Sequence, residues 1–225
     1  VFDEFNFDGA IMLTASHLPF NRNGLKFFTK NGGLEKADIS DILEIAKNIN
    51  IDTDEHSGVI SEVDLMSVYS NRFVQNIRNT LNAKNFLLPL KGFKIIVDAG
   101  NGAGGFYASK VLQQLGADIS GSQYLDPDGN FPNHIPNPED KVAMNSIQQA
   151  VIKNKADLGI IFDTDVDRAA VVDQCGNPIN RNSLVALMAS IILDEHPETT
   201  IVTDSITSDG LKTFIQDNLK GKHHR

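Results

Sequence analysis

A polar loop between Thr14 and Lys26, with the sequence TASHLPFNRNGLK, holds three side chains that could do chemistry. Ser16 offers a hydroxyl nucleophile, His17 an imidazole and Lys26 an amine. The loop follows the apolar run 10–13, and its Asn, Gly and Pro residues are typical of an exposed turn. A nucleophile, a proton carrier and a cation in one turn are the parts of a phosphoryl-transfer site.

A second polar cluster lies far downstream, in the sequence IIFDTDVDR from 160 to 168. Asp163, Asp165 and Asp167 occupy alternate positions after an apolar run, and Arg168 follows them. Three carboxylates spaced in this way can converge on one hard cation such as Mg²⁺. Alternating aspartates also occur in solvated turns and in calcium loops, but this stretch lacks the glycine and distal glutamate of an EF-hand.

Apolar runs alternate with amphipathic stretches along the chain, which predicts strands alternating with helices. Asp38 is the expected N-cap of the first clear helix. Expected helices cover 39–49, 61–82, a stretch that ends near Gly116, 140–153, 183–194 and 208–219. Expected strands cover 94–97, 158–162, 169–172 and 200–203. We expect the terminal His223 and His224 to be disordered rather than to form a metal site.

The alternation predicts an α/β fold with mixed, mostly parallel sheets sandwiched by helices. Ligands of such sheets lie at the carboxyl ends of the strands. Ser16, Asn101 in a glycine-rich turn, and the three aspartates all follow apolar runs. We therefore expect them to meet at one edge.

The composition limits the classes of function. The 225 residues include 29 acidic and 20 basic side chains, a formal net charge of −9, which argues against nucleic acid or an anionic membrane as the main partner. No run approaches the roughly 18 apolar residues of a membrane span. The one cysteine, Cys175, excludes an internal disulfide and favours a reducing compartment such as the cytoplasm. Because the chain begins with Val1, we interpret it as a fragment, and an organelle is the alternative location if a transit peptide preceded it.

Four motifs, in this order along the chain, resemble those of one enzyme superfamily. TASHLPFNRNGLKFF resembles the phosphoserine loop of the α-D-phosphohexomutases, which comprise phosphoglucomutases, phosphomannomutases and phosphoglucosamine mutases. KIIVDAGNGAGG resembles the opening of their second domain, and FPNHIPNPE resembles a loop of that domain. FDTDVDR resembles their magnesium loop. The resemblance implies an isomerase that interconverts hexose 1-phosphates and 6-phosphates through a phosphoserine and a bisphosphorylated sugar.

The resemblance also implies roles for individual residues. Ser16 matches the serine that carries the phosphoryl group and contributes to the metal site, and the three aspartates match the Mg²⁺ ligands. His17 and Lys26 match residues thought to assist proton transfer or to bind the phosphate, and Arg168 matches the arginine after the metal loop. The implied cofactors are Mg²⁺ and a hexose 1,6-bisphosphate, and the implied partner is a phosphorylated hexose. The sequence leaves the identity of the sugar and the oligomeric state open.

The same resemblance implies a division into domains. Residues 1–88 correspond to the carboxyl-terminal part of a first domain with the phosphoserine loop, 89–178 to a second domain with the metal loop, and 179–225 to the start of a third. The sugar-recognition loop and the phosphate-binding fourth domain would lie outside this chain. We therefore expect that the fragment alone turns over no hexose phosphate.

Three alternatives compete with this interpretation. A strand that ends in Phe-Asp-x-Asp also fits a haloacid-dehalogenase-type phosphatase, in which Asp163 would be the nucleophile. Gly100, Gly102 and Gly105 satisfy the spacing G-x-G-x-x-G of dinucleotide-binding turns. The third alternative is a truncated mutase that serves as a binding module and has no enzymatic activity.

Overall fold

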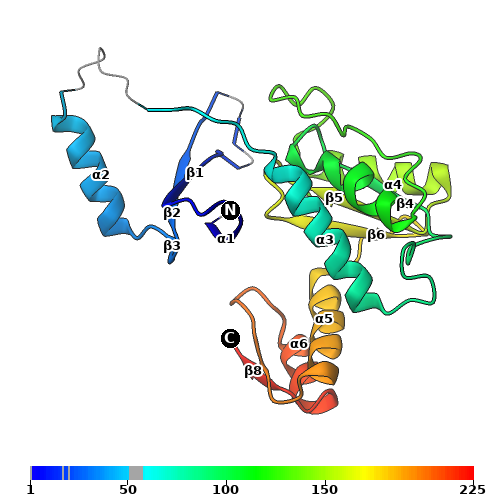
Figure 1. The fold of residues 1–225 in the computed structure, drawn as a ribbon. Helices are drawn as coiled ribbons and strands as arrows, with labels where there is room; N and C mark the ends of the chain where they lie inside the picture. The colour runs from blue at the N-terminus through cyan, green and yellow to red at the C-terminus, as the bar shows by residue number, and fades with distance from the viewer. Residues whose placement is uncertain (1, 17, 20, 51–57) are drawn as a thin grey trace.

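The described part of the chain builds three small sheets, each with its own helices. The computed structural model describes residues 2–16, 18–19, 21–50 and 58–225. Figure 1 shows the sheets as separate lobes along the chain, from the amino-terminal hairpin to the carboxyl-terminal strand. The α/β class with mixed sheets, expected from the sequence, is confirmed. The expectation of mostly parallel pairing was wrong, because among the described residues the amino-terminal sheet is antiparallel throughout and the central sheet has one antiparallel pairing.

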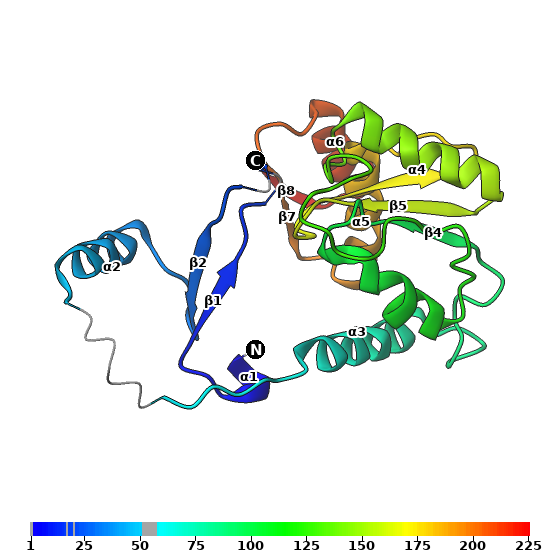
Figure 2. The ribbon, with the colours of Figure 1, turned by 90° about the horizontal axis from the view of Figure 1, so that it is seen from above.

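The first sheet is antiparallel and forms a hairpin. The sheet consists of β1 (Gly9–Leu13), β2 (Leu25–Thr29) and β3 (Gly32–Gly33). The helices α1 (Phe2–Phe5) and α2 (Lys36–Asn48) precede and follow it in the chain. The register runs from Gly9 opposite Thr29 to Leu13 opposite Leu25, so the loop 14–24 is the tip of the hairpin. Figure 2 shows this tip directed at the neighbouring lobe.

The helix α2 starts earlier than the sequence predicts. Glu35 is its N-cap, and Asp38 lies at the third helical position, where its carboxylate accepts the backbone N–H of Glu35 at 2.9 Å. This reciprocal pairing is a capping box. The expectation that Asp38 caps the helix was wrong because a glutamate can take the N-cap position when an aspartate three residues on completes the box.

The central sheet joins strands that are far apart in sequence. β4 (Ile95–Asp98) pairs in parallel with β5 (Leu158–Phe162), which pairs antiparallel with β6 (Ala169–Asp173). Since parallel strands end at one edge, the residues that follow β4 and β5 are brought together. All four residues of β4 are buried, as expected for a strand covered on both faces.

Two layers of helix cover this sheet. α4 (Lys141–Asn154) packs Ile147 and Val151 on one face, against Ile96 and Ile161. On the other face lies a helical stretch of three short pieces, η1 (Ala103–Gly105), the π-helix η2 (Tyr107–Leu112) and η3 (Gln113–Leu115). Alternate strand residues thus face opposite layers, as the two-residue repeat of a strand requires.

The long helix α3 (Leu65–Leu81) packs on the outside of η2 and η3, where Val74 contacts Val111 and Leu115. It begins four residues later than the predicted start at 61, because the Asp64 side chain caps it by accepting the N–H of Ser67. We call α3, the helical stretch 103–115, α4 and the β4–β5–β6 sheet the central unit.

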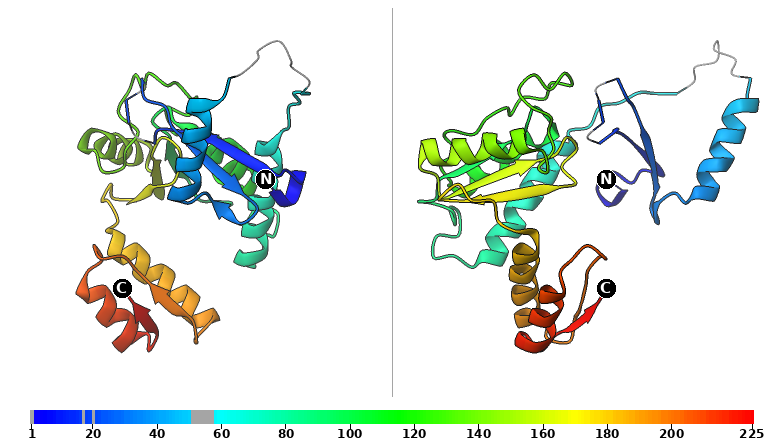
Figure 3. Two further views of the ribbon diagram at one scale, coloured as in Figure 1. Left: turned by 90° about the vertical axis from the view of Figure 1, so that its left-hand side faces the viewer. Right: turned by 180° about the vertical axis from the view of Figure 1, so that it is seen from behind.

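The carboxyl-terminal lobe is a small β-α-β arrangement, seen from two sides in Figure 3. It comprises α5 (Arg181–Glu195), β7 (Thr200–Val202), α6 (Asp209–Thr213), η4 (Phe214–Asn218) and β8 (Lys222–His224). β7 and β8 pair in parallel over an apolar core that includes Leu193 and Ile215. The expectation of a disordered end was wrong, since His223 and His224 lie in a paired strand.

An ion pair between Arg181 and Glu139 links this lobe to the loop that precedes α4. The division at 88 and 178 stays a prediction. Among the described residues, none of the helices has both the length and the apolar character needed to cross a bilayer.

Candidate active site

Ser16 lies at the tip of the β1–β2 hairpin in an unusual backbone conformation. Its φ is +55°, in the left-handed region that few residues other than glycine adopt. The base of the loop is closed by the N–H of Thr14, which donates to the carbonyl of Gly24 at 3.1 Å. A Cβ on Gly24 would lie 2.4 Å from the carbonyl oxygen of Thr14, so only glycine permits this closure. A tight, strained turn therefore presents the Ser16 hydroxyl.

Asp163, Asp165 and Asp167 lie in the turn between β5 and β6, which we call the metal turn. The N–H of Asp163 donates to the carbonyl of Arg168 at 3.1 Å, which closes the turn. Val166 at its apex has φ +66°. The carbonyl of Thr164 accepts the N–H of Ala103 at 2.8 Å and so fixes the turn against the start of the helical stretch 103–115. The turn is thus held from both sides at the carboxyl edge of the central sheet.

Arg168 connects this turn with Ser16. Its Nε and Nη2 lie 3.1 and 3.0 Å from Oδ2 of the fully buried Asp163, and its backbone N–H donates to Oδ1 of the same residue at 3.1 Å. Its Nη2 also donates to Oγ of Ser16 at 3.4 Å. A guanidinium is therefore held beside the candidate nucleophile by a buried carboxylate.

The electrostatics of the turn reflect crowded carboxylates. Burial raises the pKa of Asp163, and the neighbouring Asp167 and Asp165 raise it further, against the lowering effect of the N–H of Arg168. Like charges at this distance disfavour simultaneous ionisation. A cation bound among them would reverse this effect.

Asp165 reaches across to the hairpin. Its Oδ2 accepts the hydroxyl of Thr14 at 2.8 Å and lies 3.9 Å from Nζ of Lys26. Its Oδ1 is buried and has no hydrogen-bond partner. A buried carboxylate oxygen without a partner is costly unless a cation or a donor fills the space before it.

The donor set fits a hard cation. One carboxylate oxygen from each of Asp163, Asp165 and Asp167 lies within 4.8 Å of the others. Mg²⁺ and Ca²⁺ prefer oxygen ligands of this kind. The Oδ1 of Asp165 supports the same assignment, because it is a buried carboxylate oxygen of these residues that has no hydrogen-bond partner.

A cleft of about 460 Å³ opens beside these groups. The hairpin tip and the metal turn form two of its sides, and the loops 101–103 and 127–131 form the rest. Its walls include Arg22 and Asn23 from the hairpin and Asn101, Asp128 and Phe131 from the central unit.

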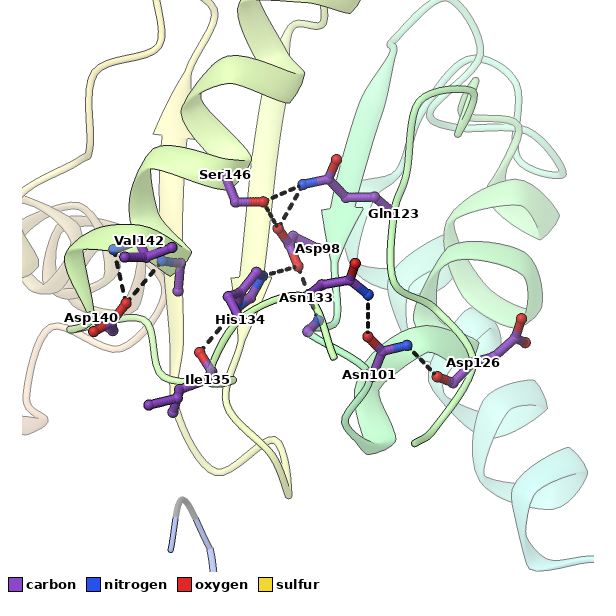
Figure 4. Close-up of polar contacts among 12 residues, drawn as sticks. Asp98, Asn101, Gln123, Asp126, Asn133, His134, Ile135, Asp140, Val142 and Ser146 are labelled. Carbon is purple, nitrogen blue, oxygen red and sulfur yellow. Dashed lines mark hydrogen bonds and ion pairs between the residues drawn. The ribbon is translucent and has the colours of Figure 1, made fainter. Parts of the chain in front are cut away.

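A buried polar network lies at the end of β4, directly before the loop 101–103 that lines the cleft (Figure 4). Asp98, the last residue of β4, accepts His134 Nε2 at 3.0 Å, Gln123 Nε2 at 2.8 Å, the hydroxyl of Ser146 at 2.9 Å and the N–H of Gly100 at 3.0 Å. Both Asp98 oxygens are thereby satisfied, although the residue is fully buried.

Asn101, which lines the cleft, is fixed by two further hydrogen bonds. Its side-chain amide donates to the carbonyl of Asp126 at 2.8 Å, and Asn133 donates to its Oδ1 at 2.8 Å.

Burial by itself lowers the pKa of His134. The hydrogen bonds to Asp98 and to the carbonyl of Ile135, with the charges of Asp98 and Asp140, outweigh burial and raise that pKa above its usual value.

The glycine-rich turn has a packing role that opposes the dinucleotide alternative. A Cβ on Gly102 would lie 2.8 Å from the carbonyl oxygen of Thr164, and one on Gly105 would lie 1.8 Å from that of Leu125. A Cβ on Gly100 would lie 2.8 Å from Pro136. The close approaches that require glycine here are to the protein's own backbone and side chains, which explains the spacing without a pyrophosphate.

The phosphatase alternative is disfavoured by the environment of Asp163. This carboxylate is fully buried, and both its oxygens accept hydrogen bonds from Arg168. A nucleophile must be accessible to its substrate, whereas this carboxylate is engaged in holding the turn and the guanidinium.

The structure brings together most of the residues singled out from the sequence. Ser16, Lys26, Arg168 and the three aspartates meet between the hairpin tip and the metal turn. His17 lies outside the described residues. Sequence reasoning missed Thr14, whose position two residues before Ser16 was the available signal.

Two models of one protein family match the chain. The model described as phosphoglucomutase/phosphomannomutase, alpha/beta/alpha domain I, matches residues 1–56, and the model of alpha/beta/alpha domain II matches residues 71–176. Together they span well over half of the chain.

Individual relatives agree with these matches. A phosphoglucosamine mutase from Caldicellulosiruptor saccharolyticus is 35% identical over 189 residues, which cover 81% of this chain and 39% of that protein. A phosphomannomutase/phosphoglucomutase from Pseudomonas syringae pv. tomato is 31% identical over 208 residues, covering 92% and 42%. The chain thus spans about two fifths of the length of these relatives.

Solved structures share the fold. The crystal structure of a phosphoglucomutase/phosphomannomutase family protein from Burkholderia thailandensis superposes with a TM-score of 0.77 at 26% identity, covering 96% of this chain and 44% of that one. The N-acetylphosphoglucosamine mutase of Aspergillus fumigatus, in complex with GlcNAc-6P and magnesium, has a TM-score of 0.56 at 14% identity, covering 96% and 55%, and this likeness concerns the fold alone.

Proposed function

The chain belongs to the α-D-phosphohexomutase superfamily, and from this membership we propose that the protein interconverts hexose 1-phosphates and 6-phosphates. One observation carries the proposal. The hairpin tip with Ser16 and the turn with three aspartates meet across two lobes, and Arg168 contacts both Ser16 and Asp163.

Ser16 carries the phosphoryl group in this proposal. The phosphoryl group leaves Oγ of Ser16 and bonds to a free hydroxyl of the sugar monophosphate, which gives a hexose 1,6-bisphosphate and a free serine. The sugar then presents its other phosphate, and Ser16 Oγ takes that group back. The net result is a phosphate moved between the two ends of the sugar, with the serine phosphorylated again.

The transferred group is anionic and loosely bonded in the transition state, so its charge must be neutralised in place. Arg168 supplies a guanidinium that Asp163 orients with two contacts from its Oδ2. Lys26 supplies an ammonium, positioned near Asp165 at 3.9 Å with half of its side chain exposed. Because Lys26 is held less tightly than Arg168, it can follow the phosphate as the sugar reorients.

The three aspartates and a phosphoryl oxygen on Ser16 would hold a Mg²⁺ ion. Such an ion, when bound, supplies charge neutralisation at the transferred phosphoryl group. The support for it is the unpartnered Oδ1 of Asp165 and the convergence of three carboxylate oxygens.

A proton must leave the attacking hydroxyl and return to the serine. Lys26, whose ammonium lies 3.9 Å from Oδ2 of Asp165, and His17, because imidazole side chains ordinarily exchange protons near neutral pH, are the proposed carriers. The substrate is a phosphorylated hexose, and a hexose 1,6-bisphosphate is the activator that keeps Ser16 phosphorylated. We also propose a cytoplasmic or organellar location, which the single exposed thiol of Cys175 supports.

The chain is proposed to consist of the end of a first domain (1–88), a second domain (89–178) and the start of a third (179–225). The contact between Thr14 and Asp165 supports a site at the junction of the first two.

The test is phosphoryl transfer to Ser16. The purified chain is incubated with glucose 1,6-bisphosphate and Mg²⁺, and the phosphorylated residue is identified by intact-mass and peptide mass spectrometry. We expect one phosphoryl group on Ser16. Ser205→Ala, which removes an exposed serine that does not line the cleft, should take up the same amount, and Ser16→Ala should take up none. Phosphate found on Asp163, or uptake by Ser16→Ala equal to that of the wild type, would refute the assignment.

A further inference from the structure

Thr14 joins the two halves of the candidate site without taking part in the proposed phosphoryl transfer itself. Its hydroxyl donates to Oδ2 of Asp165 at 2.8 Å and accepts the backbone N–H of Ser16 at 2.9 Å. The first contact spans 151 residues of sequence and crosses between two lobes. We propose that Thr14 is a positioning residue that sets the phosphoryl-carrying serine and the middle metal-binding aspartate relative to each other. This proposal rests on the proposed function.

The polarity of the link is fixed by its two partners. A threonine hydroxyl has one hydrogen to donate and lone pairs to accept with. The backbone N–H of Ser16 can only donate, and a carboxylate oxygen accepts. The hydroxyl of Thr14 therefore serves as acceptor for one loop and as donor for the other, and no other arrangement satisfies both.

On the hairpin side, the link supports a strained backbone. Ser16 has φ +55°, a left-handed backbone conformation that is strained for a residue with a side chain. A hydroxyl that accepts the N–H two residues on is a recognised way of stabilising such a turn. Without it, the N–H of Ser16 loses the partner that holds the turn, and the Ser16 hydroxyl is no longer aimed across the cleft.

On the metal side, the link determines which oxygen of Asp165 is left for a cation. Oδ2 receives the Thr14 hydroxyl and faces Lys26, while Oδ1 is buried and without a partner. Lys26 lies 3.9 Å from Oδ2, too far for a hydrogen bond, so it adds charge without fixing the rotation of the carboxylate. The short bond from Thr14 is the contact that fixes it.

The hydroxyl of Thr14 therefore sets the position of Ser16 and the orientation of the Asp165 carboxylate at the same time. Hydrogen-bond partners that orient metal ligands typically change metal affinity or activity by about 10- to 100-fold when removed. Thr14 differs from an ordinary partner of this kind because it also holds the residue that carries the phosphoryl group.

The test compares two substitutions that separate the hydroxyl of Thr14 from the branched shape of its side chain. Thr14→Val keeps the branched side chain and removes the hydroxyl, whereas Thr14→Ser keeps the hydroxyl. Magnesium affinity is measured by calorimetry, and phosphate uptake on Ser16 from glucose 1,6-bisphosphate by mass spectrometry. Amide hydrogen exchange of Ser16 gives a third readout that needs neither metal nor phosphate. Circular dichroism confirms that each variant is folded.

We expect Thr14→Val to weaken magnesium binding about tenfold or more, to slow phosphate uptake and to speed exchange of the Ser16 amide, with Thr14→Ser close to the wild type in all three. Equal magnesium affinity and equal Ser16 exchange in Thr14→Val and the wild type would overturn the positioning role. Failure of the proposed function would look different: the wild-type chain itself would take up no phosphate on Ser16, while the exchange of its amide would still respond to Thr14→Val.

Discussion

Replacing Asp98 by Asn should destabilise the central unit by about 3 kcal/mol near pH 6, the low end of the cost of breaking a buried ion pair. Asn has the same shape as Asp, so no cavity opens. The change removes the negative charge next to His134 and turns one of two acceptor oxygens into an NH₂ group. His134 and Asp98 are almost completely buried at their side chains, 2% and 0% exposed, so water cannot replace what is lost.

The pH dependence of this cost follows from the pKa of His134. That pKa is raised in the folded protein above the unfolded value of about 6.5. A raised histidine pKa contributes stability that is fully present below the unfolded pKa and is lost as pH rises through the folded pKa. The gap between wild type and Asp98→Asn should therefore be largest near pH 6 and should shrink towards pH 9, where His134 is neutral and the Asp98 carboxylate keeps only the hydrogen bonds from its neutral donors.

Tyrosine fluorescence offers a readout of this unit. The chain has no tryptophan, and its three tyrosines, Tyr69, Tyr107 and Tyr124, all lie in or next to the central unit. Denaturant unfolding followed at tyrosine wavelengths gives the free energy of unfolding at each pH. Asp126→Asn is the matched control. Asp126 is exposed, and its main-chain carbonyl, which accepts the amide of Asn101, is unchanged by the substitution. A gap below about 0.5 kcal/mol at pH 6, the range of ordinary surface substitutions, or a gap that grows with pH would refute the reasoning.

Three further outcomes are expected. Asp165→Asn should weaken magnesium binding, measured by calorimetry, by at least about tenfold while the protein remains folded, and unchanged affinity would count against the three-carboxylate site. Gly105→Ala should cost several kcal/mol in chemical denaturation because its Cβ would lie 1.8 Å from a carbonyl oxygen, whereas Gly129→Ala, with open space around it, should cost less than about 1 kcal/mol. The 225-residue chain alone should show no sustained turnover of glucose, mannose or glucosamine 1-phosphates by phosphorus NMR. It spans about two fifths of the length of these relatives, and the remote contacts that position a sugar are expected outside it. Steady magnesium-dependent formation of a 6-phosphate would refute this.

Much of the central unit could be predicted from the sequence because its signals are local. The strand 158–162 was predicted with its observed bounds, and the helix expected at 140–153 was found at 141–154 with Asp140 as its N-cap. Both follow from the apolar pattern and from the residues that begin and end each element. The metal turn was predictable for the same reason, because three aspartates directly follow a buried strand.

Other features depend on contacts that no local pattern contains. The strand β8 forms because Lys222 to His224 pair with β7, and an isolated reading of KHH shows no strand signal. The helical stretch 103–115 was expected as one helix but consists of 3₁₀ and π pieces. It begins where Gly104 and Gly105 pack closely on Phe162 and Leu125, so tertiary packing determines its geometry.

The candidate site shows the same limit most clearly at Thr14. Its residue type was visible in the sequence, but its importance comes from a bond to Asp165 across 151 residues. A motif records which residues recur together and gives no distance between two motifs. Here the distance is set by a hairpin tip closed at Gly24 and a metal turn fixed to Ala103, each rigid for its own local reasons. Because both loops are rigid, one hydroxyl between them can transmit a change in either, and a site built in this way should respond sharply to a substitution that alters neither the nucleophile nor the metal ligands.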